Sequence, residues 1–207
     1  MNAGVMVDGP LALPEAQWAE LEAAYRMPAR AYHHFGHVRE VLAHYDEVAR
    51  GPGWRQRREV WLAVLYHDAV YVPGRGDNEA RSAELAREAV GRWLPEAGLD
   101  VARIEKLILL TARHGALAPG EVDHEAALFL DCDMAILGAP AERFDAYDAA
   151  IAREYRGHVP AVLYRVRRRA FLKGLLARER IFLSDFFHAR LDAQARANLR
   201  RALSAKR

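Results

Sequence analysis

The segment Val60-Trp61-Leu62-Ala63-Val64-Leu65-Tyr66-His67-Asp68-Ala69-Val70-Tyr71 places a histidine and an aspartate directly after an apolar run. Apolar residues on nearly all sides indicate a buried helix. Neighbouring helix positions point about 100° apart, so we expect His67 and Asp68 to straddle one inner face of that helix. A buried carboxylate is costly unless it is paired or bound to a metal ion. The segment therefore predicts either a buried His67–Asp68 hydrogen bond or a metal site.

The composition indicates one domain with a large core. Of the 207 residues, 52% are hydrophobic and 28% are charged. No apolar stretch reaches the roughly 18 residues of a membrane-spanning helix, and residues 1–14 lack the features of a signal peptide. The single cysteine, Cys132, excludes an internal disulfide. Together these features predict a soluble, cytoplasmic protein that does not bind membranes.

Positive charge is concentrated near the C-terminus, although the net charge is only +2. Residues 161–207 contain 13 Lys and Arg against 3 Asp and Glu. Such a division can mark an anionic partner, or two parts of a chain that dock on each other. We expect helices at about 141–205 to pack on a core at about 28–140, without stable nucleic-acid binding. Four basic residues are expected to form the solvated face of a helix: Arg165, Arg167, Arg168 and Arg169.

Helical periodicity runs through nearly the whole sequence, and no segment alternates convincingly in the manner of a strand. Prolines, glycines and capping residues divide the chain into expected helices at about residues 14–27, 32–50, 55–71, 78–94, 100–114, 123–138, 140–155, 160–177 and 184–205. Asp77 and Asp100 lie where they could cap the helices that follow them. The pattern predicts an all-α bundle of eight to nine helices in one domain, residues 1–207.

Further polar residues lie beside the apolar stripes. His33 and His37 are four positions apart and are expected to share a helix face. Asp131 and Asp133 lie within an otherwise apolar helix and point roughly 200° away from each other. Asp133 has the larger apolar neighbours at helical spacing, so we expect it to face a metal ion, with an ion-pairing or capping role for Asp131. Imidazole with carboxylate suits Mn, Fe, Co, Ni or Zn, whereas thiolate pairs for a structural zinc site are absent.

Four motifs resemble the HD superfamily of metal-dependent phosphohydrolases, and in particular one bacterial subgroup of it. They are Arg30-Ala31-Tyr32-His33-His34-Phe35-Gly36-His37-Val38, His67-Asp68-Ala69-Val70-Tyr71 followed by Asp77-Asn78-Glu79-Ala80-Arg81-Ser82-Ala83, Phe129-Leu130-Asp131-Cys132-Asp133-Met134-Ala135-Ile136-Leu137-Gly138, and Ile181-Phe182-Leu183-Ser184-Asp185-Phe186-Phe187. The likeness spans roughly residues 15–203. It departs from the subgroup at His34, where asparagine is common.

The resemblance implies an HD-type helical bundle in which a divalent metal ion (Mn, Co, Ni, Fe, Zn or Mg) is bound by His37, His67, Asp68 and Asp133. It also implies hydrolysis of a phosphate ester or anhydride, in a nucleotide or a related small phosphorylated metabolite. The metal would lower the pKa of a bound water and polarise a phosphoryl oxygen. Asp68 could also orient that water or bridge to a second ion.

Other polar residues near these motifs are candidates for the catalytic site. Glu79 could serve as an acid or base, or could simply favour the start of its helix electrostatically. The candidates for substrate binding are Arg30, His33, Asn78, Ser82 and His114. Their alternatives are ordinary structural roles: capping or surface positions for the amide and hydroxyl, core or supporting positions for the histidines, and a surface ion pair for the arginine.

Two other functions stay open from the sequence. The HD fold also occurs in di-iron oxygenases, which use more histidine ligands, and here His33 and His114 are the obvious spare histidines. A module that retains the metal but senses a nucleotide or nucleic acid would account for the basic C-terminal portion. Iron content and oxygen consumption would identify the first function. Tight, salt-dependent binding without turnover would identify the second.

Overall fold

The computed structural model describes residues 7–26 and 30–205, and within these ranges the regular structure is entirely helical. Nine α-helices and one short 3₁₀ helix are present in the described residues, which confirms the predicted all-α bundle of eight to nine helices. None of these helices combines the length and apolar character that a bilayer crossing requires. The chain divides into two compact units, with the boundary between Ala112 and Arg113. The predicted end of the first helix, at Met27, lies outside the described residues.

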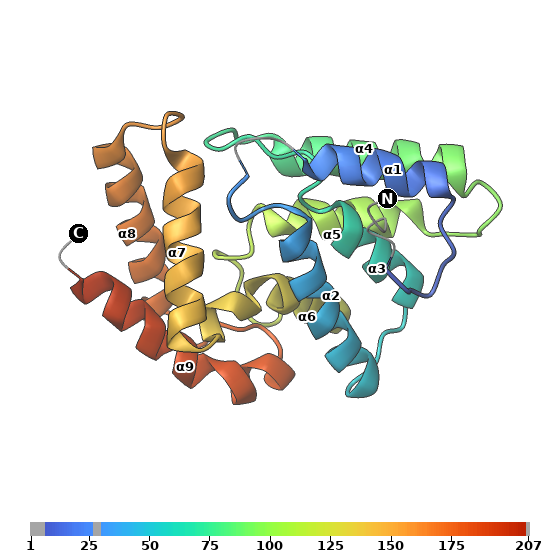
Figure 1. The fold of residues 1–207 in the computed structure, drawn as a ribbon. Helices are drawn as coiled ribbons and strands as arrows, with labels where there is room; N and C mark the ends of the chain where they lie inside the picture. Colours follow the sequence, from blue (N-terminus) through green and yellow to red (C-terminus); the bar gives the residue numbers. More distant parts are fainter. Residues whose placement is uncertain (1–6, 27–29, 206–207) are drawn as a thin grey trace. The chain divides into compact units, whose positions relative to one another are not determined.

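The N-terminal unit contains five helices (Figure 1): α1 (Glu15–Tyr25), α2 (Phe35–Arg50), α3 (Arg57–Tyr66), α4 (Asn78–Trp93) and α5 (Val101–Thr111). Helix α3 contacts α2, α4 and α5, which explains why its apolar residues are buried on every side. Helix α1 is fixed to α3 by the edge-to-face contact of Trp18 with Trp61, whose ring centroids are 6.1 Å apart. The Tyr25 hydroxyl also donates a hydrogen bond to the Leu65 carbonyl at 2.9 Å.

Helix α3 ends at Tyr66, so the predicted helix through residue 71 is wrong at its C-terminal end. His67 is the C-cap residue, and Asp68 lies in the turn that follows. The two residues therefore do not straddle one helix face. The helix stops because the backbone groups of the next residues form hydrogen bonds with side chains from distant segments, including Arg30 and Ser82.

Helix α2 begins at Phe35, later than the pattern predicts. His34 has an extended backbone and caps the helix, because its Nδ1 accepts a hydrogen bond from the backbone N–H two residues later at 2.9 Å. His33 is consequently outside α2, so the expectation that His33 and His37 share a helix face is wrong. Their rings nevertheless approach edge to face, with centroids 5.8 Å apart.

The two aspartates expected to cap helices behave differently. Asp100 accepts a hydrogen bond from the Arg103 backbone N–H at 2.9 Å and caps α5 as predicted. Asp77 precedes α4 but makes no side-chain capping bond. Its carboxylate instead binds the Arg75 guanidinium at 2.6 and 2.7 Å. The local arginine therefore replaces the helix N-terminus as the partner of this acid.

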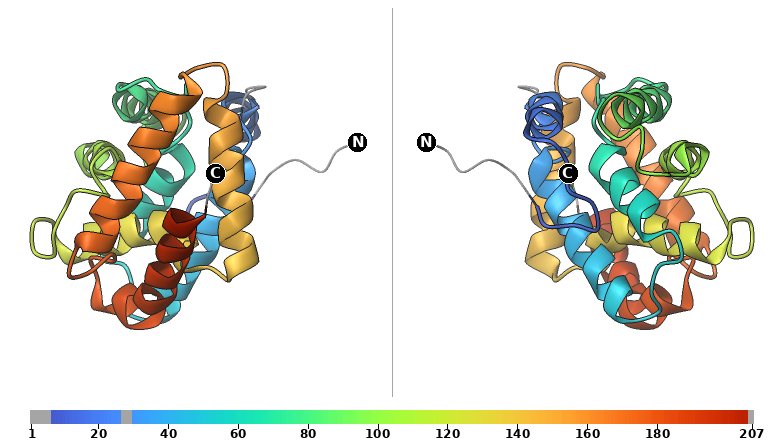
Figure 2. Two further views of the ribbon diagram at one scale, coloured as in Figure 1. Left: turned by 90° about the vertical axis from the view of Figure 1, so that its left-hand side faces the viewer. Right: turned by 90° about the vertical axis from the view of Figure 1, so that its right-hand side faces the viewer.

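The C-terminal unit contains α6 (His124–Met134), the 3₁₀ helix η1 (Ala135–Gly138), α7 (Ala141–Tyr155), α8 (Ala161–Ala177) and α9 (Asp185–Ser204) (Figures 1 and 2). Helix α9 contacts η1, α6, α7 and α8. Gly138 is required where η1 meets α9, because a Cβ atom there would lie 2.9 Å from the Leu191 carbonyl oxygen and 2.6 Å from its Cβ. The single helix predicted at 123–138 is thus an α-helix that ends in a 3₁₀ turn.

Asp131 ties α6 to the start of α9. Its Oδ1 accepts a hydrogen bond from the Leu183 backbone N–H at 2.8 Å, and its Oδ2 accepts bonds from the Ser184 N–H and hydroxyl at 2.7 and 2.6 Å. Ser184 in turn caps α9. Burial raises the pKa of the Asp131 carboxyl to about 6, although these hydrogen bonds act to lower it. Asp131 therefore has a structural role at a helix start.

Candidate metal centre

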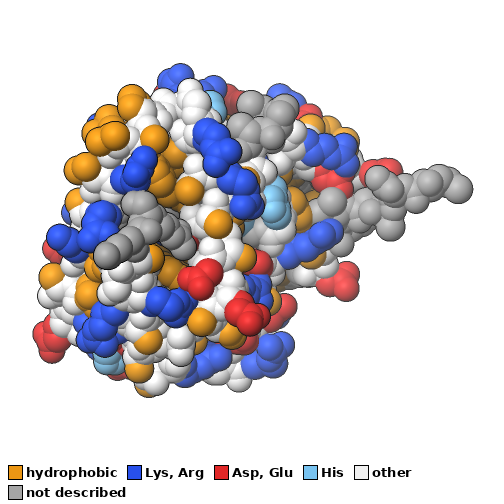
Figure 3. Space-filling model, turned by 60° about the vertical axis from the view of Figure 1, so that its left-hand side comes forward, with side chains coloured by type: hydrophobic (Ala, Val, Ile, Leu, Met, Phe, Trp, Pro, Cys, Tyr) orange, Lys and Arg blue, Asp and Glu red, His pale blue; other side chains and the backbone are white. Residues whose placement is uncertain are grey.

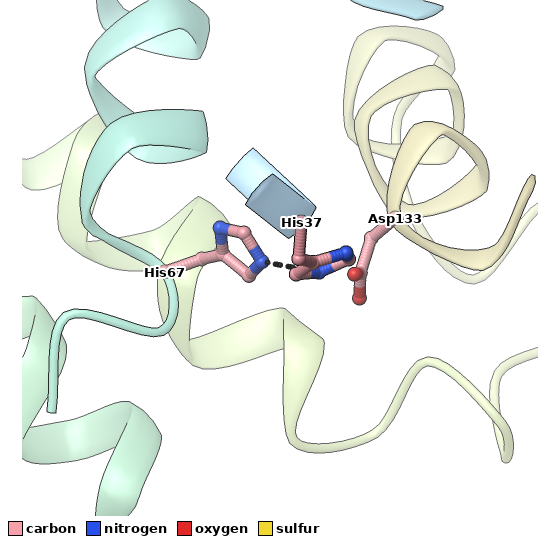
Figure 4. Close-up of side chains that lie close together, drawn as sticks. All are labelled: His37, His67 and Asp133. Atoms are coloured by element: carbon pink, nitrogen blue, oxygen red, sulfur yellow. Dashed lines mark hydrogen bonds between the residues drawn. The ribbon is translucent and has the colours of Figure 1, made fainter. Parts of the chain in front are cut away.

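Two histidines and one aspartate of the N-terminal unit converge on one point. His37 Nε2 lies 3.2 Å from His67 Nε2, the contact drawn as a dashed line in Figure 4, and 3.6 Å from Asp68 Oδ2. His67 Nε2 lies 3.2 Å from Asp68 Oδ2. Both histidines are buried, whereas 15% of the Asp68 side chain is exposed. Two imidazoles and a carboxylate thus form a small triangle that solvent reaches from the aspartate side.

The tautomer of His67 follows from its hydrogen bonding. Its Nδ1 lies 2.8 Å from the Val64 carbonyl oxygen, which can only accept a hydrogen bond. Nδ1 therefore carries the ring proton, and in the neutral ring Nε2 presents a lone pair toward His37 and Asp68. A histidine that ligates a metal ion almost always donates its other N–H to such a partner. The contact with the Val64 carbonyl thus gives His67 the tautomer that a metal ligand would need.

The neighbouring histidines keep the Asp68 carboxyl of the triangle ionised. Burial alone would raise the pKa of the Asp68 carboxyl, but the neighbouring imidazoles of His67, His33 and His37 hold that pKa well below its ordinary value. The carboxylate is therefore ionised at neutral pH. A partly buried anion beside two inward-facing imidazole nitrogens requires a compensating positive charge, which either a proton or a metal ion can provide.

The donor set and its spacing suit a divalent metal ion. Zinc–nitrogen and zinc–carboxylate bonds measure about 2.0–2.2 Å, so adjacent ligand atoms in tetrahedral or octahedral coordination lie roughly 2.8–3.6 Å apart. The three separations in the triangle of His37, His67 and Asp68 are 3.2, 3.2 and 3.6 Å. Imidazole with carboxylate is a set that Mn, Fe, Co, Ni and Zn accept.

Asp133, the predicted fourth ligand, belongs to the C-terminal unit. Asp133 lies near the end of α6, and its Oδ2 is 3.0 Å from His114 Nδ1. The predicted His/Asp cluster is present in the described residues as His37, His67 and Asp68, whereas the identity of the ion and the part of Asp133 in binding it stay predictions.

Arg30 supports the turn that carries Asp68. Its Nη1 donates hydrogen bonds to the carbonyls of His33 and Asp68 at 3.0 and 2.9 Å, and its Nη2 donates to the Ala69 carbonyl at 2.9 Å. The guanidinium also lies over the Tyr25 ring, 5.0 Å from the ring centroid. These contacts join the segment before α2 to the turn after α3. A role for Arg30 in binding phosphate stays a prediction.

Ser82 and Asn78 of α4 hold the next part of the same loop. The Ser82 hydroxyl accepts a hydrogen bond from the Val70 N–H at 3.0 Å and donates one to the Val70 carbonyl at 3.2 Å. The Asn78 amide makes the equivalent pair of bonds with Val72, both at 3.0 Å. Both side chains are buried, so neither has a surface role, and their part in binding substrate stays a prediction. They lie four positions apart on one face of α4 and immobilise the loop that follows Asp68.

Three predicted site residues remain, namely His33, Glu79 and His114. His33 stacks on Tyr71, with ring centroids 4.0 Å apart, and is half-buried. Glu79 is in the first turn of α4 and is partly exposed, so its catalytic and electrostatic roles both stay predictions. His114 contacts Asp133 as described above. Sequence reasoning gave no role to Tyr71, although it lies in the second motif, or to the Val64 carbonyl, because a sequence does not show which ring stacks on Tyr71 or which side chain binds a backbone group.

Comparisons of this chain with protein-family models, with curated proteins and with solved structures give no match. Assignment to the HD superfamily is therefore a proposal that depends on the motifs and on the triangle of His37, His67 and Asp68.

Proposed function

We propose that this protein is an HD-type, metal-dependent phosphohydrolase. Its substrate would be a phosphate ester or anhydride, in a nucleotide or a related small phosphorylated metabolite. The observation that carries the proposal is the convergence of His37 Nε2, His67 Nε2 and Asp68 Oδ2 at separations of 3.2–3.6 Å in a partly accessible position. The four sequence motifs support the same function.

The proposed ligands of the divalent ion are His37, His67 and Asp68, with Asp133 as the fourth. When bound, the ion supplies acidity to a water molecule and withdraws negative charge from a phosphoryl oxygen. The N–H of His67 Nδ1 stays on the Val64 carbonyl, so the ring keeps its orientation while Nε2 serves the site.

Asp68 is the proposed catalytic carboxylate. It is ionised and partly exposed, so it can accept a hydrogen bond from an attacking water and orient that water toward phosphorus. His33 is also half-buried, and its imidazolium form would favour an anionic substrate beside Tyr71. Arg30, Asn78 and Ser82 preorganise the turn, because fixed backbone positions keep Asp68 in one geometry.

A metal-by-substrate screen tests this proposal on protein purified without chelator, by scoring released phosphate and pyrophosphate. We expect hydrolysis that chelator abolishes and that Mn²⁺, Co²⁺ or Ni²⁺ restores. Asp68→Ala should remove activity, with a loss of roughly 100-fold or more, and should leave the helical circular dichroism unchanged. Asp46→Ala is the matched control, because Asp46 is an exposed residue of α2.

Near wild-type turnover by Asp68→Ala on a substrate that the protein hydrolyses would show that the triangle is not the catalytic centre. Oxygen consumption by iron-loaded protein, without release of phosphate, would instead favour the di-iron oxygenase.

A further inference from the structure

The C-terminal unit contains a cavity of about 530 Å³ that is built from residues outside the candidate metal centre. Its walls come from the second half of α7, the connection at residues 156–160, much of α8 and the end of α9. Figure 2 shows α7 and α8 joined at one end by this connection. Small-molecule sites in proteins usually have volumes of about 300–1,000 Å³. The cavity is therefore large enough for a metabolite.

The charged residues of the cavity wall are mostly basic. Four arginines line it, namely Arg156, Arg165, Arg168 and Arg169, against one acid, Asp148. Asp148 is engaged by Arg168, because its Oδ1 accepts a hydrogen bond from Arg168 Nε at 3.0 Å and lies 2.9 Å from Nη2. The wall thus has an excess of positive charge, which favours an anionic occupant.

Arg168 is held rigidly at the cavity wall. Its guanidinium lies over the rings of Tyr147 and Phe171, 5.2 and 5.6 Å from their centroids, and only 13% of its side chain is exposed. Within the described residues, its buried Nη2 makes no hydrogen bond of acceptable geometry. Its Nη1 donates a hydrogen bond to the Tyr147 hydroxyl at 3.4 Å. A guanidinium has five N–H donors, so Arg168 can bind Asp148 and Tyr147 and still offer donors to a carboxylate or phosphate.

The start of α8 strengthens this preference for an anion. The N-cap residue is Pro160, which supplies no side-chain capping bond, and the first turn of the helix contains no acid. Ala161, the first residue of α8, lines the cavity. The uncapped N–H groups and the helix dipole place partial positive charge at this end of the helix.

The rest of the wall is apolar and aromatic. It includes Ala152, Val159 and Leu172. It also includes Tyr155 and Tyr164, whose ring centroids are 5.3 Å apart. Burial raises the pKa of the Tyr164 phenol to about 12, so the ring is neutral at physiological pH. This wall would cover an apolar body and not a second charged group.

We propose that this cavity is a binding site for a small organic anion that carries one carboxylate or phosphate on an apolar or aromatic body. The anionic group lies near Arg165, Arg168 and the start of α8, and the body lies against Tyr155 and Tyr164. Figure 3 shows hydrophobic side chains among Lys and Arg side chains on the face that it draws. This binding is independent of the proposed hydrolysis.

Isothermal titration of the full chain, in the presence of chelator, tests the site with two pairs of probes. AMP is compared with adenosine, and octanoate with 1-octanol, so that phosphate and carboxylate head groups are distinguished. We expect saturable binding of at least one anion, about tenfold or more tighter than its neutral partner, as one charged hydrogen bond would produce.

Two charge-reversal variants locate the binding. Arg165→Glu, in the cavity wall, should weaken binding by about tenfold or more. Arg167→Glu changes the same charge at an exposed position of α8 outside the wall and should leave the affinity unchanged. Ala152→Trp, which fills the cavity, should abolish binding while circular dichroism shows an intact fold. Absence of saturable binding up to millimolar anion would overturn the proposal, as would equal binding of the neutral partners or equal effects of the two reversals.

Discussion

The Ser82 hydroxyl connects α4 to the loop that carries Asp68, and Ser82→Ala removes this connection alone. In the native protein the hydroxyl accepts from the Val70 N–H at 3.0 Å and donates to the Val70 carbonyl at 3.2 Å. Ser82 is fully buried. Alanine differs only by the missing oxygen, so the variant leaves two backbone groups of Val70 without their partner.

The free-energy change follows from three contributions. Two lost hydrogen bonds of about 1 kcal/mol each, with incomplete resolvation of the Val70 groups, give roughly 2–3 kcal/mol of destabilisation. Alanine favours a helix interior by up to about 0.5 kcal/mol relative to serine, which offsets a small part of this loss. We therefore expect Ser82→Ala to lower the free energy of unfolding by about 2 kcal/mol.

Urea denaturation measures this change, and Ser204→Ala is the matched control. The Ser204 hydroxyl is exposed and donates only to the Arg200 carbonyl within α9. Its removal should change the free energy of unfolding by less than about 0.5 kcal/mol. Hydrogen exchange should also show faster exchange of the Val70 amide in Ser82→Ala.

A role of Ser82 in binding phosphate makes the opposite prediction. In that case Ser82→Ala would raise KM for the substrate while stability and Val70 exchange stayed at wild-type values. Equal unfolding free energies for Ser82→Ala and Ser204→Ala would therefore refute the structural role assigned to this hydroxyl.

Three further predictions concern the C-terminal unit. Gly138→Ala should destabilise the protein by about 1–3 kcal/mol, because the added methyl group meets the α9 backbone. Gly91→Ala, in an open helical position, should instead stabilise the protein by roughly 0.5–1 kcal/mol. Thermal denaturation of the two variants measures both changes. Asp131→Ala should cost about 2–4 kcal/mol in urea, because three donors at the start of α9 lose their acceptor, and a change below about 0.5 kcal/mol would contradict its structural role. The pKa of Asp192 is lowered: burial opposes this shift, but hydrogen bonds from the Ile181 N–H and Arg196 outweigh it. Its contribution to stability is therefore present above the unfolded-state pKa of about 4 and is lost as pH falls through the lower folded pKa, so acid titration of Asp192→Asn should show a shallower loss of stability than the wild type.

The helices were predictable because their signals are local. Apolar residues at helical spacing, together with prolines and glycines between segments, defined the elements within a few residues. The end of α3 was not predictable in this way. The helix ends where Ser82 and Arg30 bind backbone groups that could otherwise continue it. These side chains lie 12 and 38 positions along the sequence from the backbone groups that they bind. A local pattern contains no information about contacts over that distance.

The types of residue in the candidate metal centre were predictable, but the hydrogen bonds that hold the loop after Asp68 were not. His37, His67 and Asp68 were expected to form a polar cluster, and the structure brings them together. Asn78 and Ser82 were candidates for substrate binding, with capping or surface roles as the alternative, and a role in binding substrate stays a prediction. Side-chain type does not distinguish a ligand oxygen from a backbone carbonyl, so their hydrogen bonds to the loop could be found only in the structure.

The cavity in the C-terminal unit was not foreseen. A run of arginines on α8 was expected to be a solvated helix face, which holds for Arg167 and fails for Arg168. The difference arises because Asp148 and two aromatic rings enclose Arg168. These partners come from α7 as well as α8, so helical spacing alone did not reveal the enclosure.

Metal content, measured by elemental analysis of protein purified without chelator, tests the proposed centre most directly. Wild-type protein should contain about one equivalent of a divalent transition metal, as expected for a site with nitrogen and oxygen ligands. His67→Ala should lose that metal while its circular dichroism stays helical. His158→Ala removes an exposed histidine and should keep the metal. Equal metal content in wild type, His67→Ala and His158→Ala would contradict a metal centre at His37, His67 and Asp68.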